Sequence, residues 1–92
     1  MMISNRRYEF TPPDSSSAII IEGLQHYSPG RTRKVDVYKL DVPAEHAARF
    51  GGRVDFNTWK ALIATLARMF CDGDEKAAAD RMVLKWSDRP PL

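Results

Sequence analysis

One apolar stripe, recurring through residues 58–71, constrains the fold of this chain more than any other feature. Its members are spaced by three and four positions, which places them on one face of a helix. Asn57 or Asp55 is expected to cap the start of this helix, and Gly73 suits the left-handed conformation that ends one. The rest of the chain must cover the stripe, which consists of Trp59, Leu62, Ile63, Leu66, Met69 and Phe70.

Length and composition indicate a small, soluble protein. A chain of 92 residues predicts a single domain over 1–92. The longest strongly apolar run, residues 18–21, is far shorter than the ~20 residues that span a bilayer. Arg6 and Arg7 are not followed by the apolar segment of a signal peptide. Cys71 is the only cysteine, which excludes an intrachain disulfide and fits a reducing cytoplasm.

Three segments have the composition of β-strands. Residues 6–10 alternate aromatic and charged side chains, which predicts a short strand at a sheet edge. Residues 18–22 are rich in β-branched side chains, which predicts a strand buried on both faces. Residues 32–42 predict a third strand, after a turn that contains Pro-Gly. Its alternation slips between Val37 and Tyr38, so either both faces are covered there or a bulge resets the register.

Two further helices are predicted after the strands. Pro43 suits the first turn of a short helix over residues 44–50, which a Gly-Gly pair ends. Asp74 is placed to cap a last helix over residues 75–86. Because the strands precede most of the helices, the fold class is α+β. We expect about three antiparallel strands, with the short helix and a C-terminal helical hairpin packed on one face.

The sequence contains no enzymatic motif. No spacing or local signature links Cys71 with His26 or His46 for nucleophilic catalysis. Two histidines on different predicted elements do not make a metal site. The acidic run at residues 72–75 lacks the remaining ligands of a calcium loop, and helix capping explains it better. We therefore expect neither enzyme activity nor a cofactor.

Basic charge concentrates at one place, the predicted hairpin tip HYSPGRTRK over residues 26–34. The tip holds three cations and two rings and contains no acid. Cations contact phosphate, and an exposed Tyr or His ring stacks on an unpaired base. The alternative is a solvated hairpin end, where basic residues also prevent edge pairing. The candidate binding residues are Arg31, Arg33, Lys34, Tyr27 and His26, assisted by Arg6 and Arg7 if the first strand pairs beside the tip.

The predicted C-terminal helical hairpin also fits a helix-turn-helix. Lys76, Arg81 and Lys85 would then face a DNA groove. The same helix carries Glu75 and Asp80, however, and its apolar residues are needed for packing. A core helix with a charged outer face is the favoured interpretation.

Taken whole, the chain resembles the small phage-encoded anti-CRISPR proteins that inhibit type I-F surveillance complexes. The resemblance lies in the compact α+β layout, the MMISNRRYEF opening, the HYSPGRTRK hairpin and the lack of an enzymatic motif. It implies a non-enzymatic inhibitor that acts in the host bacterial cytoplasm, without a membrane or a small-molecule substrate. The implied partner is a multi-subunit Cas protein–guide RNA complex, whose recognition of target DNA is blocked. Two alternatives stay open: a small DNA-binding regulator that uses the helical hairpin, and a protein-interaction module without nucleic-acid contact.

Overall fold

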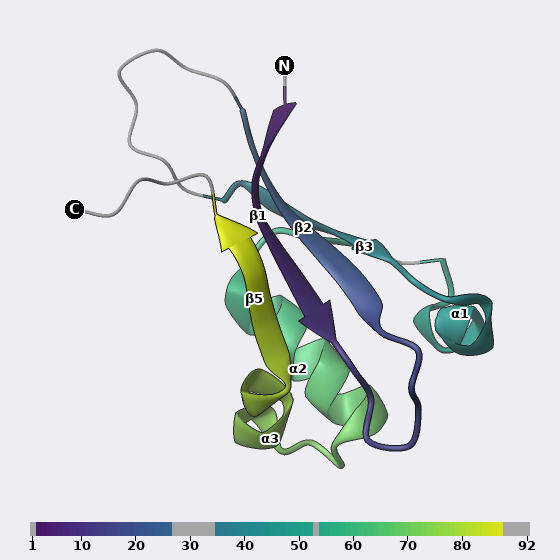
Figure 1. Cartoon of the computed structure of the whole chain (residues 1–92). Helices are drawn as coiled ribbons and strands as arrows, with labels where there is room; N and C mark the ends of the chain where they lie inside the picture. Colours follow the sequence, from purple (N-terminus) through teal and green to yellow (C-terminus); the bar gives the residue numbers. More distant parts are fainter. Residues whose placement is uncertain (1, 27–34, 53, 88–92) are drawn as a thin grey trace.

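The computed structural model describes residues 2–26, 35–52 and 54–87. Within these residues, five strands form one antiparallel sheet in the order β4-β3-β2-β1-β5. The helix α2 covers one face of this sheet, and α1 and α3 lie toward one end of it (Figure 1). The strands are β1 (Met2–Phe10), β2 (Ile19–His26), β3 (Val37–Asp41), β4 (Asp55–Phe56) and β5 (Met82–Ser87), and the helices are α1 (Ala44–Phe50), α2 (Trp59–Phe70) and α3 (Glu75–Asp80).

The predicted α+β class is confirmed, but the predicted sheet is too small. The sequence predicts about three strands, whereas the described residues form five. One of the added strands, β4, has only two residues and pairs with β3. The other, β5, pairs with β1, so that β1 lies between two neighbours and not at the edge.

The predicted last helix over residues 75–86 is wrong in its second half. Helix α3 ends at Asp80, and the chain continues as the strand β5. The apolar residues of this segment have helical spacing, but Val83 and Trp86 also have high strand propensity. The edge of β1 offers main-chain partners to this segment. The pairing runs from Phe10, opposite Met82, to Arg6, opposite Ser87. Pairing with β1 therefore decides the structure of a segment whose local pattern is ambiguous.

Helix α2 agrees with its predicted position. It begins after Thr58, whose side-chain oxygen accepts a hydrogen bond from the Ala61 N–H at 3.0 Å. The cap is thus Thr58 and neither Asn57 nor Asp55. At the other end, Gly73 has φ of +83° and its N–H donates to the Ala67 carbonyl at 2.9 Å. Asp72, with φ of +52°, also has a left-handed conformation, so the left-handed ending of the helix begins one residue before the predicted glycine.

Replacing Thr58 with alanine is expected to destabilise the protein by about 1 kcal/mol, because the Ala61 N–H loses its acceptor. The matched control is Asn57→Ala, which removes a neighbouring exposed side chain that does not cap α2. Urea unfolding followed by circular dichroism measures both variants. Equal losses in the two variants would contradict the assignment of Thr58 as the cap.

The core lies between α2 and the sheet face that it covers. Phe10, Ile19 and Ile21 from the sheet are fully buried, as are Leu62 and Leu66 from α2. Aromatic rings extend this core toward both ends of the helix. The Trp59 ring centroid lies 5.0 Å from that of Tyr8 and 5.7 Å from that of Tyr38, and Phe70 packs similarly between Phe10 and Phe50.

A bulge and a bend interrupt the regular pairing of the strands. The register between β1 and β2 shifts between Ser4 and Arg6, opposite Gly23. A Cβ at Gly23 would lie 2.8 Å from Cγ2 of Val35, so the glycine leaves room for that side chain. The chain bends at Asp36, just before β3 begins. The bend accounts for the slipped alternation, because Val35 packs against the core while β3 starts a new register.

Candidate functional site

The predicted binding residues fall into two groups. Tyr27, Arg31, Arg33 and Lys34 lie outside the described residues. The other three lie on two paired strands: His26 ends β2, and Arg6 and Arg7 belong to β1.

Asp36 links the described residues on either side of residues 27–34 through hydrogen bonds. Its Oδ2 atom accepts a hydrogen bond from the His26 backbone N–H at 2.8 Å and lies 3.6 Å from Nδ1 of the same residue. The Asp36 N–H donates in turn to the Leu24 carbonyl at 2.7 Å. The aspartate side chain is largely buried, whereas the His26 side chain is exposed. Asp36 thus connects the two strands at the base of the basic segment, which is residues 26–34, and no local sequence pattern indicates this role.

Arg6 and Arg7 point to opposite faces of the sheet. Arg6 is opposite Gly23 and lies on the helix side, near Tyr38. Burial raises the pKa of the Tyr38 hydroxyl, Tyr8 adds to the rise, and the charge of Arg6 opposes it. Arg7 is opposite Glu22 on the other face. The two arginines therefore do not form one basic patch, and β1 places Met2, not either arginine, opposite His26.

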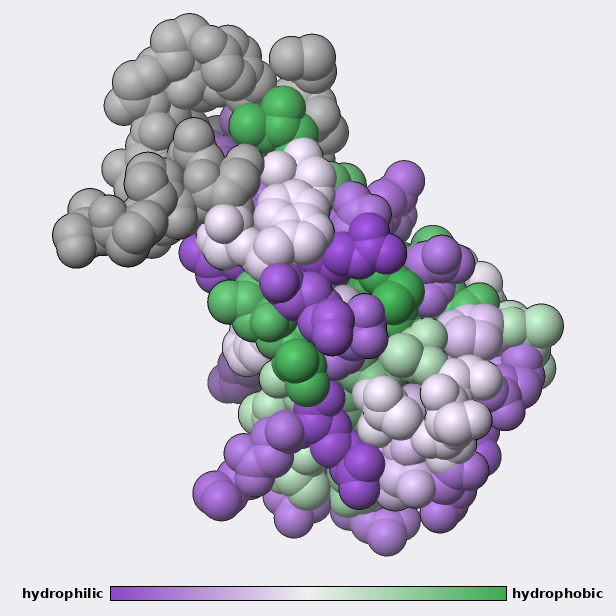
Figure 2. Space-filling view, viewed as in Figure 1, coloured by the Kyte–Doolittle hydropathy of each residue, from purple (hydrophilic) through white to green (hydrophobic). Residues whose placement is uncertain are grey.

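The face of the sheet away from α2, here called the open face, carries two rows of side chains. The first row crosses the strands as Trp86, Arg7, Glu22 and Lys39, in which each residue is the register partner of the next. The second row is Val83, Glu9, Ile20 and Asp41, paired in the same way. Figure 2, viewed as in Figure 1, shows strongly hydrophilic and hydrophobic residues interleaved over the sheet.

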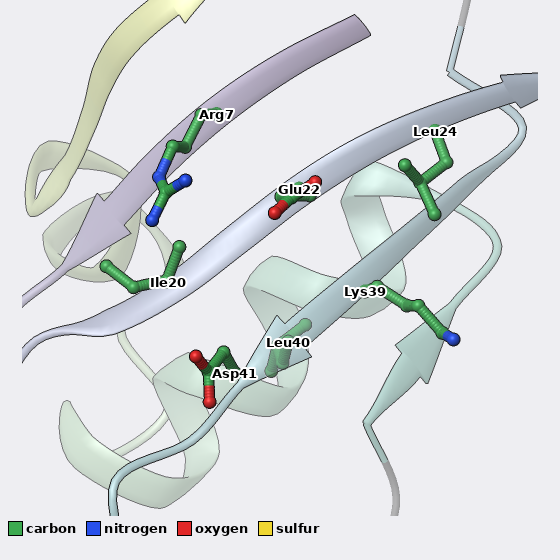
Figure 3. Close-up of a pocket in the computed structure, with 7 residues that line it drawn as sticks. All are labelled: Arg7, Ile20, Glu22, Leu24, Lys39, Leu40 and Asp41. Carbon is green, nitrogen blue, oxygen red and sulfur yellow. The ribbon is translucent and has the colours of Figure 1, made fainter. Parts of the chain in front are cut away.

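A shallow hollow of about 220 Å³ lies on the open face. Its lining mixes charged and apolar residues from three strands (Figure 3): Arg7, Ile20, Glu22, Leu24, Lys39, Leu40 and Asp41. Two contacts hold carboxylates at this face. Ser4 Oγ donates to Glu22 Oε2 at 3.2 Å, and Lys85 Nζ lies 3.9 Å from Glu9 Oε1. The lining of the hollow therefore combines charges of both signs with apolar side chains.

A second cleft of about 420 Å³ contains a serine, a histidine and a carboxylate. Ser15 Oγ donates to Glu45 Oε1 at 3.0 Å and accepts from the Ser17 N–H at 2.9 Å. Nε2 of the buried His46 lies 3.3 Å from Ser15 Oγ and 3.7 Å from Glu45 Oε1. In a catalytic triad the serine and the acid contact different ring nitrogens of the histidine. Here both approach Nε2, so the cluster ties the β1–β2 loop to α1 and does not form a relay.

Glu45 provides a test of this cluster. Hydrogen bonds from the Ser17 and Ser15 side chains lower the pKa of the Glu45 carboxyl, and the nearby His46 adds to this. Because the pKa of Glu45 is lower in the folded than in the unfolded protein, its ionised carboxylate stabilises the fold at pH values above the ordinary pKa of glutamate. This stabilisation is lost as the pH falls through the folded-state pKa. Ser15→Ala is expected to raise the pKa of Glu45 in an NMR carboxyl titration. Ser16→Ala, at an exposed neighbour, is the control, and equal pKa values in both variants would exclude the bond.

The remaining sequence candidates for chemistry do not converge in the structure. Burial raises the pKa of the half-buried Cys71 thiol, while Arg81 opposes the rise, so the thiol is mainly protonated at neutral pH. Among the described residues, no group of three or more His, Cys, Asp or Glu side chains is arranged to hold a metal ion. In the same part of the chain, no helix has the length and apolar character needed to cross a membrane.

The cations of the predicted DNA-reading helix lie on different elements and contact their own chain. Lys76 in α3 lies 3.7 Å from Asp80, and Arg81 Nη1, just after α3, donates to the Thr11 carbonyl at 3.3 Å. Lys85 is in β5, beside Glu9. With only six residues in α3, these side chains do not share a helix face.

Comparison with known proteins gives no relative. The chain matches no protein-family model, no curated protein and no solved structure.

Proposed function

We propose that this protein is a non-enzymatic inhibitor that binds a Cas protein–guide RNA surveillance complex in the host bacterial cytoplasm and blocks recognition of target DNA. The partner follows from the resemblance of the sequence to anti-CRISPR proteins. Arg31, Arg33 and Lys34 contact RNA phosphates or acidic groups of the complex. Tyr27 and His26 supply stacking or shape contacts.

The observation that carries this proposal is the base of the basic segment at Asp36. The bond between Asp36 Oδ2 and the His26 N–H joins the chain on both sides of residues 27–34. A segment with three cations and no acid is thereby attached to the sheet at two points that are fixed relative to each other. Fixing the ends of a binding segment lowers the entropy that is lost on binding.

The charge distribution supports different tasks for the basic segment and for the open face. On the open face, Arg7, Lys39 and Lys85 are balanced by the carboxylates of Glu9, Glu22 and Asp41, so this surface has no excess of positive charge for a phosphate backbone. Residues 26–34 instead carry an excess of positive charge. We therefore assign nucleic-acid contact, where the complex offers it, to this segment.

The second candidate is a protein-interaction module without nucleic-acid contact. The mixed charged and apolar lining of the open face favours it, since protein surfaces provide matching groups of both signs. A DNA-binding regulator is not proposed further, because the helix on which it depended ends at Asp80.

A pull-down from host lysate, with both protein and RNA identified, separates these functions. The inhibitor is expected to capture Cas subunits together with guide RNA, and RNase treatment should not release the protein subunits. Capture of protein without any RNA species would favour the second candidate. Binding to free duplex DNA in a gel shift, in place of Cas capture, would contradict the proposal.

A further inference from the structure

The two rows of the open face carry opposite charges on β1 and β3. Across the strands, the first row reads Trp86, positive Arg7, negative Glu22 and positive Lys39. The second reads Val83, negative Glu9, apolar Ile20 and negative Asp41. The rows are neighbours, because their residues are two positions apart on β1, β2 and β3. On β1 and β3, each cation of the first row therefore has a carboxylate in the same strand of the second row, whereas β2 combines Glu22 with the apolar Ile20.

We propose that the open face is the contact surface between two copies of this chain. The two copies are related by a two-fold axis that lies in the plane of the interface. This axis runs perpendicular to the strands, midway between the two rows, and therefore exchanges the rows. The first row of one copy then faces the second row of the other. Arg7 meets the other copy's Glu9, and Lys39 meets its Asp41. Trp86 meets Val83, and Glu22, held by Ser4, packs beside Ile20.

Several observations favour a second copy as the occupant of this face. One symmetry operation brings both cations of the first row onto carboxylates, and an unrelated partner would have to match the same pattern independently. In this dimer the open faces of two identical sheets pack together, and the strands of one copy run antiparallel to those of the other. Aligned β-sandwiches have this face-to-face arrangement. Val83 and Trp86, 53% and 41% exposed, become covered against each other.

Existing contacts at this face are compatible with the dimer. Glu9 already lies 3.9 Å from Lys85, but a carboxylate has acceptor capacity for a second donor. The inference uses the sheet and none of residues 27–34, so it does not depend on the proposed inhibitory function. A dimer of this kind uses side chains of β5 but does not pair the outer main-chain edge of this strand.

Paired charge variants test the arrangement by sedimentation equilibrium of the full chain. An acidic variant carries Arg7→Glu and Lys39→Glu, and a basic variant carries Glu9→Lys and Asp41→Lys. In each variant, like charges face one another across the two-fold axis. Because the symmetry repeats each contact, we expect self-association to weaken by about tenfold or more in either variant. A 1:1 mixture of the two variants restores opposite charges at every contact and should form a heterodimer.

The outcomes separate cleanly. The proposal predicts a wild-type dimer of twice the 10.5 kDa chain mass, two monomeric variants with native circular dichroism, and recovery of the dimer mass on mixing. A wild-type protein that stays monomeric into the high micromolar range overturns it without any need for the variants. A dimer that persists in both variants places the contact elsewhere, such as the β5 edge, and also overturns it.

Discussion

Replacing Phe10 with alanine is expected to lower the free energy of unfolding by about 3–5 kcal/mol. Phe10 is fully buried at the end of β1, where it is the register partner of both Ile19 and Met82. Its ring centroid lies 5.8 Å from that of Phe70 on α2. Truncation therefore opens a cavity where two neighbouring strands and the central helix meet. The total free energy of unfolding of a small domain is about 5–15 kcal/mol, so this variant should lose much of its stability.

Urea unfolding followed by circular dichroism measures the effect. Arg68→Ala is the control because Arg68 is exposed on α2, and it should stay within about 0.5 kcal/mol of wild type. If Phe10→Ala matches this control, Phe10 is not part of the core and the position of β1 is wrong.

Reversing the charge of Arg31 and Arg33 together is expected to abolish binding to the surveillance complex. The double variant replaces two cations with two anions in a segment that otherwise has only His26 and Lys34 as basic residues. Attraction to phosphate then becomes repulsion, and charge reversal acts on both association rate and affinity. Surface plasmon resonance against the immobilised complex measures the loss.

The matched control reverses the same amount of charge at Lys60 and Arg68, both exposed on α2. This variant should bind as wild type does, because α2 lies on the side of the sheet away from the open face and outside the basic segment. Both double variants should have wild-type circular dichroism. Full binding by Arg31→Glu/Arg33→Glu would show that the basic segment is not the site.

Much of the fold was predictable because local signals agreed with tertiary structure. The stripe from Trp59 to Phe70 predicted α2 to within a residue at each end, and Gly73 belongs to the left-handed turn that follows the helix, which begins at Asp72. Pro43 and Gly51 likewise bounded α1. Alternation in β1 also correctly separated the core-facing Tyr8 and Phe10 from the charged residues on the open face.

The errors arose where local pattern was ambiguous or where contacts were distant in sequence. Residues 82–86 fit a helix by spacing and a strand by propensity, and only the neighbouring β1 decides between them. Edge position cannot be read from β1 itself, because it depends on this C-terminal strand. The Ser15–His46 cluster joins residues 31 positions apart, and no short motif marks such a pair.

The candidate site was predictable in composition but not in arrangement. The basic residues could be identified by counting charges, whereas the bond from His26 to Asp36 depends on how β2 and the start of β3 approach each other. Arg6 and Arg7 are adjacent in sequence, and the pleat of β1 sends them to opposite faces. The complementary rows of the open face likewise exist only once the strand register is known.

The most direct test titrates the purified protein into a purified type I-F Cas protein–guide RNA complex and measures the binding of target DNA. We predict that DNA binding falls to background at one molecule of inhibitor per binding site, and that the Arg31→Glu/Arg33→Glu variant leaves it intact. Undiminished DNA binding in the presence of a large excess of the wild-type protein would contradict the proposed function.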